Sequence, residues 1–311
     1  MDLSVVILNW NTSDDLKRCL KSVESEAAGV TAPATVGGGN RDPHTGSQVS
    51  VEVVVVDNAS SDGSAGMVRE EFPWARVLEN ARNLGFSAGN NRGIEQSRGR
   101  YVLLLNPDTV VHAGAFHELV WFADRHSDAG VVGAKLLNRD GTLQYSCRRF
   151  PKMADGLFRH TPLGKLMPRN KFTRGYLLMD HDHGAEAEVD WVSGAAMLLR
   201  REVLDQVGLL DAKFFMYCED VDICYRAKQA GWKVLYCPSS VITHLIARAS
   251  DQNAARMIIQ HHKSMYRFFR KHYAAHTSRW VWPMVVAGLV ARCSLLVTKN
   301  KIDIFRMRFG L

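Results

Sequence analysis

The sequence predicts an α/β fold in which a mostly parallel, buried sheet is flanked by helices and followed by a basic helical extension. Three short apolar runs, at residues 3–9, 51–56 and 101–105, are typical of strands covered on both faces. Each run leads into Asn or Asp and then into turn or helix signals, as in repeated strand–helix units. Ligands of such sheets bind at the carboxyl ends of the strands, so these polar residues mark the predicted binding edge.

The stretch 101–111 is the centre of this prediction. Its apolar run ends in Asn106-Pro107-Asp108. Pro107 cannot donate to a strand ladder, so the strand must stop there and leave the Asp108 carboxylate at the sheet edge. On this stretch alone, an ordinary Asn-Pro-Asp turn is the alternative interpretation.

Before that stretch, the pattern predicts a helix from about Asp14, a strand at 76–78 and a loop at 80–93 that enters a helix. Residues 27–50 are rich in Gly, Pro, Ser and Thr, which predicts a flexible surface insertion. Glycines of the 80–93 segment recur every fourth residue. This spacing favours either tight helix-to-sheet packing or a ligand contact.

After that stretch, the chain alternates again between strand and helix signals. Asp140-Gly141 is a hairpin signal, and residues 150–183 are predicted to form a mobile acceptor-side region or lid. The remaining elements expected here are helices at 115–126 and 201–207 and strands at 130–133, 189–199, 233–238 and 241–244.

Residues 214–232 combine aromatic side chains with acids. Glu219, Asp220 and Asp222 crowd the first turn of a predicted helix that ends near Gly231. Acids are favoured there by the helix dipole, which is the simpler explanation. Three carboxylates directly after four aromatic or thioether side chains also suit a general base at the wall of an apolar cleft.

Charge and hydropathy change near residue 248. Residues 248–311 hold twelve of the 39 Lys and Arg but two of the 32 acids, a local excess of +10, and residues 1–247 carry −3. This predicts a domain at 1–247 and a helical region at 248–311 that meets an anionic surface. Residues 280–297 are apolar with tryptophans at one end and lysines at the other, which favours an interfacial amphipathic helix over a span. Packing onto the protein is the alternative.

Cysteine usage and the amino-terminal sequence indicate the compartment. The six cysteines are scattered without a Cys-x-x-Cys pair, which disfavours a zinc site or a disulfide framework and fits a reducing cytoplasm. The amino-terminal residues lack the features of a secretory signal.

Taken together, the motifs resemble those of inverting family 2 glycosyltransferases of the GT-A fold, close to bacterial rhamnosyltransferases. The segments that carry the resemblance, which spans about the first 245 residues, are 5–11 (VVILNWN), 55–64 (VVDNASSDGS), 83–93 (NLGFSAGNNRG), 104–108 (LLNPD), 191–195 (WVSGA), 219–222 (EDVD) and His244.

The resemblance implies a nucleotide-sugar site at the sheet edge. Asn9, Asn11 and Asp57 would border the nucleoside, with Asp57 accepting the N3–H of a pyrimidine. Asn83 and Gly85 would belong to the same donor site. Asn106 and Asp108 stand where the family has its Asp-x-Asp motif, and Asp108 and His244 would hold Mg²⁺ or Mn²⁺ at the diphosphate. Asn106 departs from the family's first Asp.

The resemblance also implies the catalytic and acceptor residues. Asp220 would be the base that takes the acceptor's proton, and Glu219 is the rival, more suited to positioning the acceptor or Asp220. Trp191, Ser193, Gly194 and Asp222 would line the sugar and acceptor cleft.

We therefore expect a cytoplasmic, peripheral membrane enzyme at the inner face of the plasma membrane. It would move L-rhamnose from dTDP-L-rhamnose, or a sugar from a UDP donor, to a lipid-linked saccharide in cell-envelope polysaccharide synthesis. A non-catalytic nucleotide-binding scaffold is the alternative, which the joint presence of Asp108, Asp220 and His244 disfavours. Binding of nucleic acid is not expected, because the upstream motifs would then have no purpose. The sequence leaves open the linkage and the oligomeric state, including a homo-oligomer.

Overall fold

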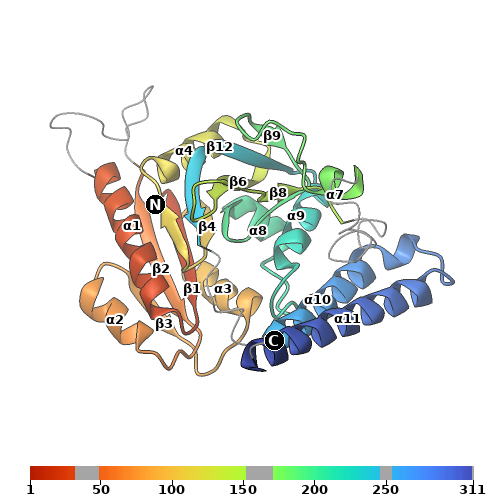
Figure 1. Cartoon of the computed structure of the whole chain (residues 1–311). Coiled ribbons are helices and arrows are strands. Elements are labelled where there is room, and N and C mark those ends of the chain that lie inside the picture. Colours follow the sequence, from red (N-terminus) through yellow and green to blue (C-terminus); the bar gives the residue numbers. More distant parts are fainter. Residues whose placement is uncertain (32–48, 152–170, 246–253, 310–311) are drawn as a thin grey trace.

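The computed structural model describes residues 1–31, 49–151, 171–245 and 254–309. A large sheet forms the centre of the body, and two long helices project from it (Figure 1). The strands of the main sheet follow the order β3-β2-β1-β4-β11-β6-β12-β5, with β7 beside β6 and β9 beside β12. Its strands are β1 (Leu3–Asn9), β2 (Val51–Asp57), β3 (Arg76–Glu79), β4 (Tyr101–Leu105), β5 (Thr109–Val111), β6 (Ala129–Leu137), β7 (Leu143–Gln144), β9 (Ala187–Glu188), β11 (Ala196–Arg200) and β12 (Lys233–His244), and β8 (Cys147–Arg148) pairs separately with β10 (Trp191–Val192).

The strand directions place several carboxyl ends at one edge. Strands β2, β1 and β4 are parallel neighbours, and β12 is parallel to β6. Strand β11 is antiparallel to both β4 and β6, so β4, β6 and β12 all point the same way. The predicted mostly parallel sheet is confirmed, with β11 as an antiparallel strand within it. The carboxyl ends of β1, β2, β4 and β12 therefore share an edge with the start of β11.

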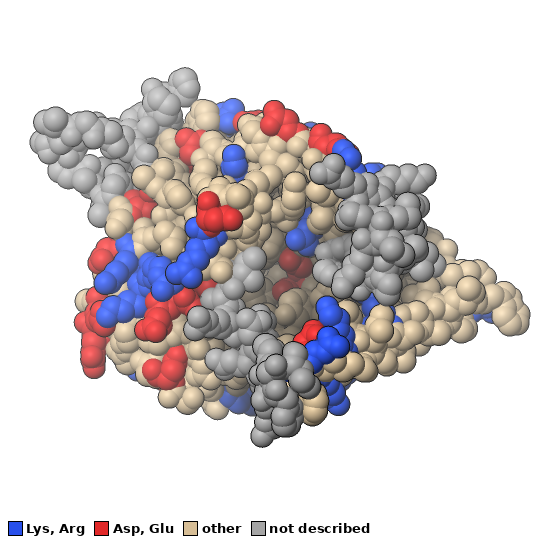
Figure 2. Space-filling model, viewed as in Figure 1, with Lys and Arg blue, Asp and Glu red and all other residues tan. Residues whose placement is uncertain are grey.

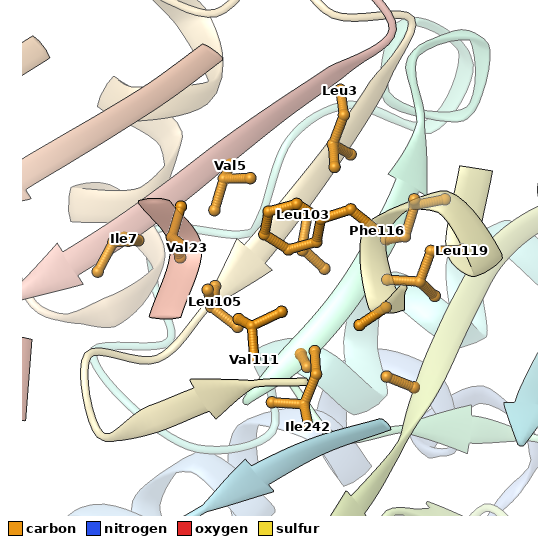
Figure 3. Close-up of a cluster of buried hydrophobic side chains, with 14 of the residues drawn as sticks. Leu3, Val5, Ile7, Val23, Leu103, Leu105, Val111, Phe116, Leu119 and Ile242 are labelled. Atoms are coloured by element: carbon orange, nitrogen blue, oxygen red, sulfur yellow. The ribbon is translucent and has the colours of Figure 1, made fainter. Parts of the chain in front are cut away.

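Helices cover both faces of the sheet. Alternate strand residues face opposite sides: Val5 and Ile7 join one core cluster, and Val6 joins the other. Figure 3 shows part of the first cluster, in which Phe116 and Leu119 pack against side chains of β1 and β4. The helices are α1 (Ser13–Thr31), α2 (Ser64–Glu71), α3 (Phe86–Glu95), α4 (Ala115–Arg125), α7 (Lys171–Tyr176), α8 (Arg201–Val207), α9 (Glu219–Gln229), α10 (Ala254–His272) and α11 (Trp282–Phe309), with a short 3₁₀ helix η2 (Ala274–His276).

Several local predictions are refined by the structure. Helix α1 continues to Thr31, beyond the expected start of the insertion at residue 27, and Val49 is already buried. Residues 32–48 of that insertion lie outside the described residues, as do residues 152–170 of the expected mobile region. The hairpin at Asp140-Gly141 is confirmed by the pairing of Leu137 with Leu143.

The helical glycines serve packing. A Cβ atom on Gly89 would lie 2.4 Å from Leu8 Cδ1, and one on Gly93 would lie 2.4 Å from Val6 Cγ1. Both glycines of α3 are buried against the sheet. Their spacing therefore lets α3 approach β1 closely, which was one of the two interpretations of the pattern.

The carboxyl-terminal helices α10 and α11 form a hairpin, and α10 packs against the body of the protein. Phe268 of α10 is 1% exposed and belongs to the core cluster on the α9 side of the sheet. The predicted carboxyl-terminal region is thus packed against the body through α10. Helix α11 has 28 residues, more than the 18 expected at 280–297, and its Trp282 ring lies 5.7 Å from that of Tyr266 on α10. By length and composition, the 25-residue segment Trp282–Arg306 is long and apolar enough to cross a membrane. None of its residues is buried.

Candidate active site

Polar residues from several segments meet at the carboxyl edge of the sheet. Asn9 and Asp57 close β1 and β2 and are register partners. Asn106 follows β4, and its N–H donates to the carbonyl of Ala195 at 2.9 Å, just before β11. Figure 2 shows that this face of the molecule is hollowed near its centre, with acidic side chains at the floor of the hollow. The polar residues of the predicted binding edge therefore lie at one edge of the sheet.

The ends of β1 and β2 are tied together by side chains. Asn9 Nδ2 donates to Asp57 Oδ1 and to Ser60 Oγ, each at 3.1 Å. Asn11 has a φ of 53°; its N–H donates to Ser60 Oγ at 2.9 Å, and its Oδ1 accepts the N–H of Ser61 at 2.7 Å. Asp57 is 2% exposed, and its Oδ2 accepts the N–H of Ser60 at 2.9 Å. The three residues predicted to border a nucleoside are therefore held in one fixed cluster.

A buried asparagine links this cluster to the loop before α3. Asn58 is 2% exposed, and its Nδ2 donates to Asn83 Oδ1 at 2.9 Å. Its Oδ1 accepts hydrogen bonds from Asn80 Nδ2 at 2.9 Å and from the N–H of Leu84 at 3.0 Å. Both the nitrogen and the oxygen of the Asn58 amide thus form hydrogen bonds with residues of the segment 80–85. Asn83 is therefore placed beside the end of β2.

Gly85 is required by both conformation and space. Its φ is 84° and its ψ 179°, a region that is essentially restricted to glycine. A Cβ atom there would lie 2.5 Å from the carbonyl oxygen of Phe215, which accepts the N–H of Phe86 at 2.6 Å. The loop before α3 is thereby joined to the segment that leads into α9.

Asp108 and His244 face one another across the edge. Asp108 Oδ1 lies 3.3 Å from His244 Nε2, and the side chains are 13% and 15% exposed. His244 Nδ1 lies 2.7 Å from Gln144 Oε1. Gln144 Nε2 donates to Asn138 Oδ1 at 2.9 Å, which fixes the amide so that Oε1 faces the histidine. Nδ1 therefore carries a proton, and Nε2 faces the Asp108 carboxylate.

This arrangement fits a cation between the two side chains. Nε2 without a proton is an acceptor that lies 3.4 Å from the Asn106 amide nitrogen and also faces the Asp108 oxygen, so a divalent ion between Nε2 and Asp108 would bind both. Two ligands about 2.1 Å from one ion at right angles lie about 3.0 Å apart, close to the observed 3.3 Å. The contact from Gln144 is the kind of outer hydrogen bond that orients a metal-binding histidine. Within the described ranges, no group of three or more His, Cys, Asp or Glu residues could hold a metal ion, so a bound ion would need further ligands.

The Asp220 carboxylate sits on backbone donors at the start of α9. The N–H of Gly194 donates to its Oδ2 at 3.2 Å, and the N–H of Val221 donates to its Oδ1 at 2.9 Å. Burial raises the pKa of Asp220 above the usual value for Asp, while these N–H groups and the charge of Arg148 lower it. A raised pKa improves a carboxylate as a proton acceptor. The donors keep it oriented.

Glu219 is in a different environment. It is 6% exposed, and its Oε2 has no hydrogen-bond partner among the residues that the structure describes. Burial and the adjacent Asp220 charge raise the pKa of Glu219 well above the usual value for Glu. Because its pKa is raised further, Glu219 keeps its proton to a higher pH than Asp220 does.

Two residues that were expected to line the cleft, Asp222 and Trp191, have their polar atoms bound by other groups of the protein. Asp222 is fully buried, and its carboxylate is bound by Arg226, Lys271 and His272. Trp191 is 5% exposed, and its Nε1 donates to the carbonyl of Arg149 at 2.9 Å. Asp222 therefore has a structural role in joining α9 to α10, and the Trp191 ring nitrogen is bonded within the protein.

Ser193 and Gly194 do lie at the edge. The N–H of Ser193 donates to the carbonyl of Ser146 at 2.8 Å, and Gly194 contacts Asp220 as described. Sequence reasoning missed Asn58, Ser60 and Gln144, which position the expected residues. Asn58 and Ser60 follow Asp57 in a polar run, which was an available signal. Gln144 had none, because its partner lies 100 residues away.

Known proteins resemble this chain in sequence and in fold. Residues 43–266 match the family described as "Glycosyltransferase like family 2". The N-acetylglucosaminyl-diphospho-decaprenol L-rhamnosyltransferase of Mycobacterium tuberculosis (strain CDC 1551 / Oshkosh) is 32% identical over 271 residues, covering 83% of this chain and 87% of the relative. The rhamnosyltransferase WbbL of Escherichia coli (strain K12) is 26% identical over 197 residues, covering 60% of this chain and 70% of that one.

Solved structures share the fold. The mannosyltransferase PcManGT from Pyrobaculum calidifontis, in complex with GDP-Man and Mn²⁺, aligns with a TM-score of 0.54 at 17% identity, covering 97% of this chain and 80% of that one. GalNAc-T7 with UDP, GalNAc and Mn²⁺ aligns with a TM-score of 0.57 at 19% identity, covering 80% of this chain and 44% of that one. Together with the family match and the relative that is 32% identical, this likeness shows that the chain is a family 2 glycosyltransferase with the GT-A fold.

Proposed function

We propose that this enzyme transfers L-rhamnose from dTDP-L-rhamnose, with inversion, to a lipid-linked saccharide in cell-envelope polysaccharide synthesis. The observation that carries the proposal is the Asp220 carboxylate, held by Gly194 at the same sheet edge as the Asp108–His244 pair. The rhamnosyl donor and the diphospho-lipid acceptor are supported by the names of the rhamnosyltransferase relatives.

The donor's nucleoside would bind at the ends of β1 and β2. Asp57 would accept the N3–H of the base, since each of its oxygens accepts one hydrogen bond, from Asn9 or from Ser60, and retains a second lone pair. Asn9 and Ser60 hold the carboxylate in place for that contact. Thymine and uracil both carry an N3–H, so this residue recognises a pyrimidine and leaves the choice of sugar to the rest of the site.

The diphosphate would lie beside Asp108 and His244. A Mg²⁺ or Mn²⁺ ion bound there would offset the charge that builds on the departing nucleoside diphosphate. Asp108 and His244 would supply two of its ligands, and phosphate oxygens and water the others, as is usual for such ions at phosphates. Gln144 would keep Nε2 of His244 free of a proton and aimed at the ion.

Asp220 would act as the general base. The acceptor hydroxyl oxygen bonds to the anomeric carbon as the bond from that carbon to the phosphate oxygen breaks, and the electron pair leaves on the nucleoside diphosphate. The hydroxyl proton passes to the Asp220 carboxylate. Attack opposite the leaving group inverts the anomeric centre. Glu219, whose raised pKa favours its protonated form, would position the acceptor next to Asp220.

The α10–α11 hairpin would bring the site to a lipid surface at the inner face of the plasma membrane. Figure 2 shows the projecting arm as largely uncharged, with a few basic side chains. Trp280 and Met284 are more than 70% exposed, and Lys299 and Lys301 lie near the other end of α11. Apolar exposure with basic flanks favours binding to anionic lipid. Co-sedimentation of the full chain with phosphatidylglycerol vesicles tests this, and equal recovery in the supernatant with and without vesicles would refute it.

The donor assignment is tested by nucleotide release across dTDP-L-rhamnose, UDP-N-acetylglucosamine, UDP-galactose and GDP-mannose. Each donor is assayed with a polyprenyl-diphosphate-linked N-acetylglucosamine acceptor, in Mg²⁺, in Mn²⁺ and in chelator. We expect release of dTDP from dTDP-L-rhamnose that chelator abolishes. Preference for a UDP-sugar would overturn the rhamnosyl donor, and full turnover in chelator would overturn the metal site. Release of nucleotide from none of the four donors would overturn the transferase proposal itself.

A further inference from the structure

Helix α10 touches the segment that carries the base on both sides of Asp220. Ser264 Oγ donates to the carbonyl of Met216 at 2.8 Å, four residues before the base. His272 Nε2 lies 2.7 Å from Asp222 Oδ1, two residues after it. Ser264 and His272 are eight residues apart on one helix, a rise of about 12 Å. One rigid element therefore holds the turn before the base and the helix after it.

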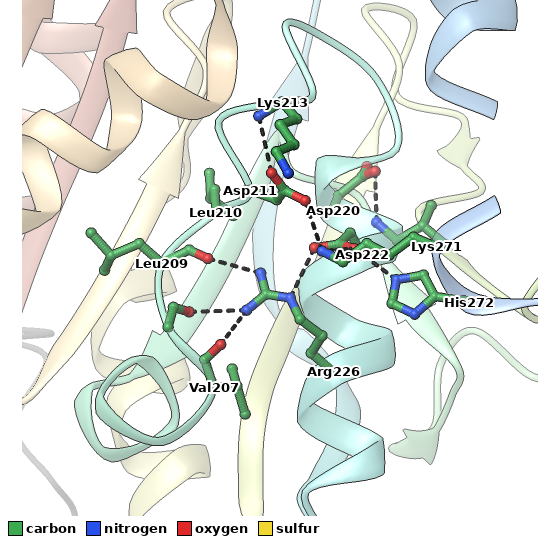
Figure 4. A network of polar contacts seen from close by, with 12 residues as sticks. Val207, Leu209, Leu210, Asp211, Lys213, Asp220, Asp222, Arg226, Lys271 and His272 are labelled. Atoms are coloured by element: carbon green, nitrogen blue, oxygen red, sulfur yellow. Dashed lines mark hydrogen bonds and ion pairs between the residues drawn. The ribbon is translucent and has the colours of Figure 1, made fainter. Parts of the chain in front are cut away.

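The contact after the base is a network of charges around the buried carboxylate of Asp222 (Figure 4). Asp222 is fully buried and lies 2.9 Å from Arg226 Nε within α9 and 2.7 Å from Lys271 Nζ on α10. Lys271 also reaches Asp211 at 2.8 Å. Burial alone would raise the pKa of Asp222, but the hydrogen bond from His272 and the charges of Arg226 and Lys271 hold it below its usual value. Removing one partner of such a buried carboxylate destabilises the contact between α9 and α10.

The contact before the base holds a strained turn. Tyr217 and Cys218 have φ values of 71° and 67°, so two consecutive non-glycine residues adopt the left-handed region. This conformation is unfavourable for a residue with a side chain and persists only where its surroundings impose it. Here α10 contributes those surroundings, through Ser264 on the Met216 carbonyl and His261, whose ring lies 5.3 Å from that of Tyr217. Cys218 is the residue directly before α9 and its carboxylates.

The loop before α3, on the proposed donor side of the site, contacts the same turn. Phe215 accepts the N–H of Phe86 at 2.6 Å and fills the space that a side chain at Gly85 would need. The turn at 215–218 therefore lies between the donor loop and α10, with the base at its end. Displacing α10 would remove the contacts of Ser264 and His261 with this turn. The pairing of β1 with β2 and the contacts of Asn58 would remain in place.

We propose that Ser264 and His272 of α10 are positioning residues for the base: they clamp the turn at 215–218 and the first turn of α9, and so set where the Asp220 carboxylate meets the acceptor hydroxyl. The inference rests on the proposed function, since it takes Asp220 as the base. It assigns part of the carboxyl-terminal helical region to the chemical step, separate from any contact with lipid.

The test uses full-length variants of both clamp residues. His272→Leu keeps apolar bulk beside Phe268 and Tyr225 but removes the N–H that faces Asp222, and Ser264→Ala removes the hydroxyl. His272→Gln retains an N–H donor and is the rescue variant. Arg270→Gln changes an exposed cation on the same helix and is the matched control. The readouts are kcat with a short-chain soluble acceptor, KM for that acceptor, and the Kd of dTDP-L-rhamnose by calorimetry.

We expect kcat to fall about 10- to 100-fold in His272→Leu and Ser264→Ala, because a small displacement of a catalytic group costs that much. Donor Kd should be unchanged in both, and His272→Gln should recover most of kcat. Wild-type kcat in both variants, or a loss of donor affinity as large as the loss of kcat, would overturn the positioning role. Asp220→Asn is measured alongside: if it keeps wild-type kcat, the base assignment fails, and the clamp with it. If Asp220→Asn is inactive while the clamp variants are normal, the clamp alone is wrong.

Discussion

Replacing Asp220 by Asn separates the two roles that the structure gives this carboxylate. Its two oxygens each accept one backbone N–H, from Gly194 and Val221. An amide keeps one of these contacts and turns its NH₂ toward the other N–H, which costs about 1–3 kcal/mol of stability. It also removes the proton acceptor, and a positioned base contributes about 10²- to 10⁴-fold to rate. That range corresponds to about 3–5 kcal/mol in the barrier.

Steady-state kinetics and calorimetry measure both effects in the same preparation. We expect kcat to fall by that factor while the Kd of dTDP-L-rhamnose stays at the wild-type value. The residues proposed to bind the donor's nucleoside, Asn9 and Asp57, lie at the ends of β1 and β2 and do not depend on Asp220. Glu219→Gln is the control: the pKa of Glu219 is raised further than that of Asp220, so an amide that mimics its protonated form should change kcat far less. Wild-type turnover in Asp220→Asn would refute this reasoning, and a larger loss in Glu219→Gln would exchange the two roles.

Three further predictions concern the residues that support the site. Gln144→Leu removes the hydrogen bond that orients His244, and we expect Mn²⁺ to be bound about 10- to 100-fold more weakly, measured from the Mn²⁺ dependence of turnover; an unchanged dependence would contradict the role of Gln144. Gly85→Ala should raise the donor KM and lower the free energy of unfolding by about 1–3 kcal/mol, while Gly141→Ala, also at positive φ but with nothing within 4 Å, should leave the donor KM unchanged. Because the pKa of Glu219 lies well above 4.5 in the folded chain, the unfolded chain loses this proton first as pH rises; the free energy of unfolding should decline from about pH 4.5 up to the folded pKa. Urea unfolding across pH should show this decline in wild type and a flatter curve in Glu219→Gln, and parallel curves would contradict it.

Much of the fold was predictable because its signals are local. The apolar runs of β1, β2 and β4 are short and bounded by turn signals, as buried strands are, and Pro107 fixes the end of β4. The antiparallel insertion of β11 was not predictable, since strand order depends on contacts between distant segments. The extent of α11 was also underestimated, because Pro283 lies in its first turn, where proline is tolerated, and the basic residues near its end do not stop a helix.

The site was predictable where residue type and strand end coincide, as for Asp57 and Asp108. It was not predictable where a side chain's direction decides its role. Asp222 lies two residues after Asp220, yet the turn of α9 aims it into the protein, where Lys271 and His272 of α10 bind its carboxylate. No local pattern predicts that pairing, because Asp222 and His272 are 50 residues apart. The same holds for Gln144 behind His244.

The anomeric configuration of the product tests most directly whether Asp220 drives a single displacement at this site. The enzyme is incubated with dTDP-L-rhamnose, the lipid-linked acceptor and Mg²⁺, and the one-bond carbon–hydrogen coupling at the new glycosidic linkage is read by NMR. Attack by an acceptor hydroxyl that has lost its proton to Asp220 predicts a linkage of the configuration opposite to that of the donor. A product that retains the donor's configuration would contradict the placement of the base and the leaving group on opposite sides of the anomeric carbon.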